Sequence, residues 1–109
     1  MSDLRARLEA IQELIRTARR NVPRGDGSEP QLSNAEKEIK VVKLTNRTYL
    51  QRTTTGFGTW YDCCLFDVLG NAQEAIDDFR NGHGWECLDR AVDHVNTVAE
   101  RVGLEAKRG

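Results

Sequence analysis

Apolar residues spaced alternately three and four apart recur in three segments of this chain, within residues 4–22, 61–79 and 85–102. Residues with this spacing share one side of an α-helix, and that side must be buried against other helices. We therefore predict an all-α fold, an antiparallel four-helix bundle. The three sets are Leu4, Leu8, Ile11, Ile15, Ala18 and Val22; Tyr61, Leu65, Val68, Ala72, Ala75 and Phe79; and Trp85, Leu88, Val92, Val95, Ala99 and Val102.

The chain of 109 residues is long enough for one domain, residues 1–109, around a single core. The first helix is expected to begin near Ser2 or Asp3 and to end before Pro23. Turn-forming residues then predict a mobile loop at about 23–32. Gly103 is the expected stop of the last helix, which leaves a frayed tail at 104–109.

The segment between these helices is ambiguous. Ser33 and Glu36 have the spacing of a capping box, which predicts a second helix that starts there. The residues that this helix would bury are Ala35, Ile39, Val42, Tyr49 and Leu50. However, the segment is rich in Val and Thr, which favour strands. The alternative is an α+β domain with a small β-hairpin sheet in residues 39–66, turning at Asn46, packed on three helices.

The C-terminal half carries the most consistent signal. A third helix is expected from a cap at Thr59 to about Arg80, followed by a short connection and a fourth helix from Trp85 to Val102. Folding the pair back at Gly82 sets apolar residues opposite one another, such as Ile76 and Leu88. The helical spacing of the apolar residues within each segment and their pairing across the turn therefore agree.

The charges are balanced overall, with 16 Lys and Arg against 17 Asp and Glu, so the net charge of −1 implies no bulk affinity for nucleic acid. The halves differ, since residues 1–57 hold 11 basic and 7 acidic side chains and residues 58–109 hold 5 and 10. Oppositely charged halves can pack on each other or meet different partners. We favour mutual packing.

No apolar run approaches the roughly 20 residues of a membrane span, and the first residues do not resemble a signal peptide. Three cysteines, two of them adjacent, do not form a secreted disulfide framework. We expect a cytoplasmic protein without membrane association.

One group of residues could bind a metal ion and one histidine could transfer a phosphoryl group, but the sequence around them does not support either function. Cys63, Cys64, His83 and Cys87 include zinc-ligand types, but the hairpin register places Cys64 roughly 20 Å from Cys87. His94 lies beside an apolar stripe, as phosphotransfer histidines do in some four-helix bundles, but its neighbours do not match that pattern. No cofactor and no enzymatic activity are therefore predicted.

The function that these observations favour is a protein–protein interaction module: an adaptor, regulator or inhibitor. Its partner would meet the charged helix faces and the aromatic residues near the turn before the third helix. The 4-3 seam of the first helix is also compatible with homodimerisation. The predicted partner-binding residues are Phe57, Trp60, Asp67, Glu74 and Asp78.

The alternative function is association with nucleic acid. Residues 39–58 contain no acidic residue, and three of their basic residues are spaced so that they would form one stripe on a helix. No helix-turn-helix, zinc-finger or RNA-recognition signature accompanies them. The candidate phosphate-binding residues are Lys40, Lys43, Arg47 and Arg52.

Overall fold

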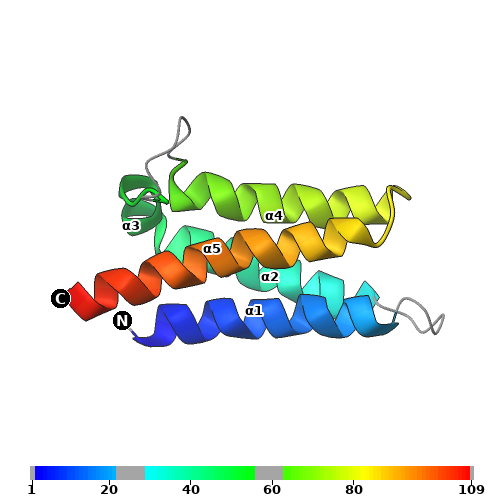
Figure 1. Ribbon diagram of the computed structural model, residues 1–109, viewed down its shortest axis with the longest axis horizontal. Helices are drawn as coiled ribbons and strands as arrows, with labels where there is room; N and C mark the ends of the chain where they lie inside the picture. The colour runs from blue at the N-terminus through cyan, green and yellow to red at the C-terminus, as the bar shows by residue number, and fades with distance from the viewer. Residues whose placement is uncertain (1, 22–28, 56–62, 109) are drawn as a thin grey trace.

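The computed structural model describes residues 2–21, 29–55 and 63–108, and within these ranges it is all-α. Its five helices are α1 (Ser2–Asn21), α2 (Glu29–Thr45), α3 (Arg47–Arg52), α4 (Leu65–Arg80) and α5 (Glu86–Arg108). The long helices pack side by side, and each runs opposite to the one before it (Figure 1). The body measures 44 × 30 × 20 Å.

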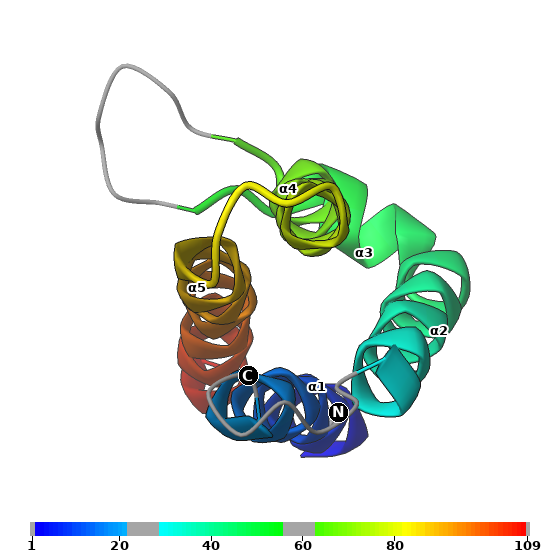
Figure 2. The ribbon, with the colours of Figure 1, turned by 90° about the vertical axis from the view of Figure 1, so that its right-hand side faces the viewer.

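The core confirms the helical period of the sequence. Viewed along the helices, α1, α5, α4 and α2 surround a common centre (Figure 2). The predicted apolar stripes of α1, α4 and α5 supply most of the buried residues, together with Leu69, Ile76, Ala91 and Val98, which widen those stripes. Val22 and Tyr61 lie outside the described residues. Trp85 is an exception, since 43% of it is exposed.

Residues 39–52 belong to α2 and α3, with Asn46 between them, as the favoured helical prediction has them, and the described part of residues 39–66 does not form the alternative β-hairpin sheet. Ile39, Val42 and Leu50 are fully buried, so tertiary packing of one helical side overrides the strand preference of the β-branched residues. In the part of the chain that is described, the strand-like threonines form a single antiparallel bridge, between Thr54 and Cys64.

Helix α2 begins at Glu29, four residues before the predicted capping box, so residues 29–32 are helical and not part of the predicted loop. Pro30 lies in the first turn, where its missing N–H leaves no helical hydrogen bond unmade. The helix is interrupted at Asn46, whose Nδ2 donates to the carbonyl oxygen of Val42 at 3.2 Å. Such side-chain bonds compete with the regular helical ladder, and α3 turns toward α4 at this point (Figure 2).

The last two helices also differ from expectation at their ends. Helix α4 begins at Leu65 after Cys64; the predicted cap at Thr59 lies outside the described residues. Helix α5 continues through Gly103 to Arg108, so the glycine is not its stop and residues 104–108 of the predicted tail are helical. A Cβ at Gly103 would lie 2.8 Å from Nη1 of Arg5, which shows that this glycine makes room for a side chain of α1.

Candidate functional site

An apolar pair lies on the solvent side of α2. Leu44 is 74% exposed, more than the other large apolar side chains of the described ranges, and Val41 is 40% exposed. Lys37 and Lys40 are exposed on the same helix. We call these four residues, Lys37, Lys40, Val41 and Leu44, the α2 outer face.

The geometry of a helix explains why these four residues form one surface. Lys37 lies three positions before Lys40 and four before Val41. Leu44 lies four positions after Lys40 and three after Val41. Residues three and four apart on a helix have Cβ atoms about 5–6 Å from each other. The opposite side of α2 is buried in the core through Leu32, Ala35, Ile39 and Val42.

The carboxylates of α2 are directed away from the α2 outer face. Arg80 of α4 binds Glu29 with two hydrogen bonds, of 3.1 and 2.6 Å, and Glu36 with one of 2.6 Å. These bonds to two carboxylates raise the pKa of Arg80 above its ordinary value. Glu38 lines a groove toward α1. The α2 outer face is therefore cationic and apolar.

The predicted basic stripe is divided by the structure. Lys43 Nζ donates to Oε1 of Gln73 at 3.0 Å and lies 4.5 Å from the ring centre of Phe66. Lys43 thus packs on α4 and is not presented to a phosphate in this arrangement. Lys40, Arg47 and Arg52 are exposed. Together, the contacts of Arg80 with Glu29 and Glu36 and those of Lys43 with Gln73 and Phe66 form what we call the α2–α4 seam.

The predicted acidic residues share one side of α4. Asp67, Glu74 and Asp78 follow one another by seven and four positions; the first two are exposed and Asp78 is half-buried. Phe57 and Trp60, the predicted aromatic contacts, lie outside the described residues. The acidic stripe lies on α4 and the α2 outer face on α2, and none of the described ion pairs joins a predicted acidic candidate to a predicted basic one.

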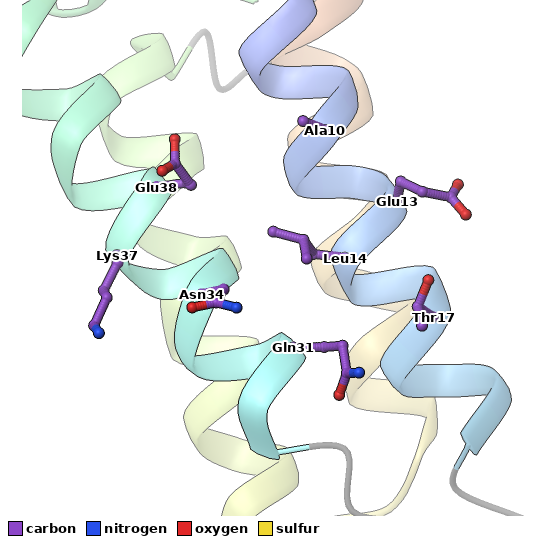
Figure 3. Close-up of a pocket in the computed structure, with 8 residues that line it drawn as sticks. All are labelled: Ala10, Glu13, Leu14, Thr17, Gln31, Asn34, Lys37 and Glu38. Carbon is purple, nitrogen blue, oxygen red and sulfur yellow. The ribbon is translucent and has the colours of Figure 1, made fainter.

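A groove of about 720 Å³ lies between α1 and α2 (Figure 3). Leu14 extends between the two helices, whereas Lys37 points away from α1 (Figure 3). The remaining lining residues are Ala10, Glu13, Thr17, Gln31, Asn34 and Glu38. Because Lys37 belongs both to the groove and to the α2 outer face, the two surfaces adjoin.

The thiols and histidines do not converge. Cys63, Cys64 and Cys87 are free, and Cys87, in the first turn of α5, is buried. Cys64 precedes α4 at the other end of the molecule (Figure 1). Within the described ranges, no three His, Cys, Asp or Glu side chains are placed to share a metal ion. Burial lowers the pKa of His94, an effect that Asp93 opposes.

An exposed aromatic residue, Trp85, lies near the turn between α4 and α5. The guanidinium of Arg19 stacks on Trp85 at 3.9 Å from its ring centre and lies 3.5 Å from Oδ1 of Asp89. The position is well suited to fasten the end of α1 to α5. Trp85 is thus partly covered by α1, which distinguishes it from Leu44.

Sequence reasoning missed the exposure of Leu44. The available signal was that Val41 and Leu44 are apolar but fall off the stripe of Ile39 and Val42. Val41 is instead one of the residues that support the alternative strand model.

No family model matches this sequence, and no curated protein or solved structure is significantly similar to it. No described helix is both long and apolar enough to cross a lipid bilayer. The function must therefore be argued from the surfaces of the chain.

Proposed function

We propose that the protein is a non-enzymatic interaction module, an adaptor, regulator or inhibitor, that binds another protein through the α2 outer face. The observation that carries this proposal is Leu44, 74% exposed beside Val41 and between cations. Full burial of a leucine side chain contributes about 1.5–3 kcal/mol. A partner that covers Leu44 therefore gains affinity from a residue that the fold itself leaves in water.

The proposal includes a finer description of the fold. We take the arrangement as an antiparallel four-helix bundle in which α3 is a kinked continuation of α2, supported by the alternating helix directions (Figure 1). A rigid bundle suits an interaction module, because the side chains of a helix face are held in place before binding. The acidic stripe of Asp67, Glu74 and Asp78 offers a second face to partners. A cytoplasmic location goes with the free thiols.

The test is a photo-crosslinking residue placed at position 44, used in lysate from the source cells with and without nuclease. We expect discrete protein adducts that survive nuclease. The same residue at Arg16, exposed on α1, is the control and should not give them. If position 44 gives no more adducts than position 16, the α2 outer face is not the binding surface.

Binding of nucleic acid is the second candidate function. Lys40, Arg47 and Arg52 are exposed, and residues 39–55 contain no carboxylate. This function predicts that charge reversal at Lys40 and Arg47 weakens binding to an oligonucleotide and reduces its salt dependence. Binding that is unchanged by the reversals would remove this candidate.

A further inference from the structure

We infer that the partner segment for the α2 outer face is an acidic amphipathic helix, with an apolar stripe bordered by Asp or Glu. This inference rests on the proposed function and names the chemistry of its partner. It is based on three features of the surface: its periodicity, its uncompensated charge and its lack of a sheet edge.

The spacing of the residues in the α2 outer face fits the side of another helix. Val41 and Leu44 are one turn apart and form an apolar centre, and Lys37 and Lys40 lie one turn before them. A partner helix that packs on α2 would place apolar residues, themselves three and four apart, over Val41 and Leu44. Its flanking residues would then meet the lysines.

The charge of the surface is uncompensated within the described chain. Lys37, Lys40 and Arg47 form no ion pair with any described residue. Among the carboxylates of α2, Glu29 and Glu36 are bound to Arg80 on the side that faces α4, and Glu38 lines the groove toward α1 without an ion pair to either lysine. Carboxylates of a partner would therefore meet cations that are not ion-paired within the described chain, and a basic partner would be repelled.

The same observations disfavour the other classes of partner. A polyphosphate backbone would lie against Leu44 and gain nothing from it, while Lys43 is engaged with Gln73 and Phe66. A peptide that binds by adding a strand needs an exposed sheet edge, and the pairing within the described ranges is limited to the bridge between Thr54 and Cys64. The surface thus fits a helix that is both apolar and acidic.

The experiment measures binding of the full chain to three synthetic helical peptides of about 18 residues, long enough to be partly helical alone. The first has a leucine stripe bordered by Glu, the second has Lys in place of Glu, and the third has Ser in place of the stripe leucines. Fluorescence anisotropy of labelled peptides gives the dissociation constants. We expect the first peptide to bind at least about tenfold more tightly than either of the others.

Two variants locate the binding. Leu44→Ser and Lys40→Glu should each weaken the first peptide about tenfold, a change equal to the loss of one buried side chain or charge pair. Leu104→Ser and Arg16→Glu are the matched controls, since both residues are exposed on other helices, and they should leave binding unchanged.

Three results would overturn the inference: equal binding of the acidic and basic peptides, no binding of either, or binding that is insensitive to Leu44 and Lys40. Tighter binding of an RNA or DNA duplex, indifferent to Leu44→Ser, would replace it with the nucleic-acid function. If the acidic peptide fails while position 44 still crosslinks to a protein, the interaction module stands and only the partner's chemistry is wrong.

Discussion

Two of the neighbours of α4, the helices α5 and α2, hold it in different ways. Between α4 and α5 the contact is extensive and apolar, with Val68, Ala72 and Ile76 among the buried residues of α4. Across the α2–α4 seam the helices touch much less, and the contacts described above are ionic or polar. The difference teaches that α4 is held to α5 mainly by hydrophobic burial, whereas next to α2 the shared core is supplemented by fixed charges near its surface.

The physical consequence is a difference in how each side responds to change. Apolar packing loses energy steeply when volume is removed, because the cavity cannot fully collapse. Contacts between partly exposed charges are screened by water and salt and contribute much less. Truncations on the two sides of α4 should therefore differ both in size and in salt dependence.

The largest effect is expected from Ile76→Ala, on the apolar side. Ile76 is fully buried, and its truncation should lower the free energy of unfolding by about 2–5 kcal/mol, measured by urea denaturation. The effect should be insensitive to salt. A loss below about 1 kcal/mol would show that the core around α4 can collapse onto the gap, against the picture of tight packing.

Arg80→Ala tests the charged end of the α2–α4 seam. The Arg80 side chain is 27% exposed and that of Glu29 is 63% exposed, so solvent screens the network. We expect a loss of about 1 kcal/mol, smaller in high salt, with faster amide exchange in the first turn of α2.

Arg20→Ala is the control for this variant, because Arg20 forms a more exposed pair with Glu13 within α1. It should change stability less than Arg80→Ala. A loss at Arg80 as large as that of Ile76→Ala would contradict the distinction between the two sides of α4.

Lys43→Met probes the other end of the seam. Methionine keeps most of the length of the side chain and can pack its thioether near Phe66, but it loses the ammonium group over the ring and the hydrogen bond to Gln73. We expect a change in unfolding free energy within about 1 kcal/mol, in either direction. A loss above about 2 kcal/mol in thermal or urea unfolding would mean that the ammonium group is a principal support of α2.

The smallest effect is expected from titration of His94 on α5. Burial lowers its pKa, so between the folded value and the unfolded value of about 6.5 the unfolded chain binds more protons. The wild type should therefore lose stability as the pH falls through and below about 6.5, relative to a His94→Gln variant. Parallel stability curves for the two proteins between pH 7.5 and about 5 would refute this assignment, and an NMR titration of the imidazole measures the shift directly.

Much of the fold could be predicted from local pattern. The helical period identified the buried sides of α1, α4 and α5, and the glycines at 82 and 84, both with positive φ, mark the turn between the last two helices. The limits of α2 and α5 could not be predicted. Gly103 has a residue type that ends many helices, yet here it accommodates Arg5, a contact between distant segments.

The candidate site was less accessible to sequence reasoning. Lys40, Lys43 and Arg47 have the spacing of one stripe, but a periodicity does not say which neighbour a helix will have. Lys43 packs toward α4 because α2 lies beside that helix. Leu44 remains exposed because no described element covers it.

The sequence by itself determined three of the long helices, α1, α4 and α5, and most of the residues that they bury, because these follow from a repeat of 3.6 residues and from the removal of apolar area from water. Only the tertiary structure decided that Glu29 and Glu36 bind Arg80, that Lys43 lies on Phe66, and that the α2 outer face is therefore left cationic and apolar. Those contacts join residues far apart in the chain, and their distances depend on how the helices are placed, which local periodicity does not specify.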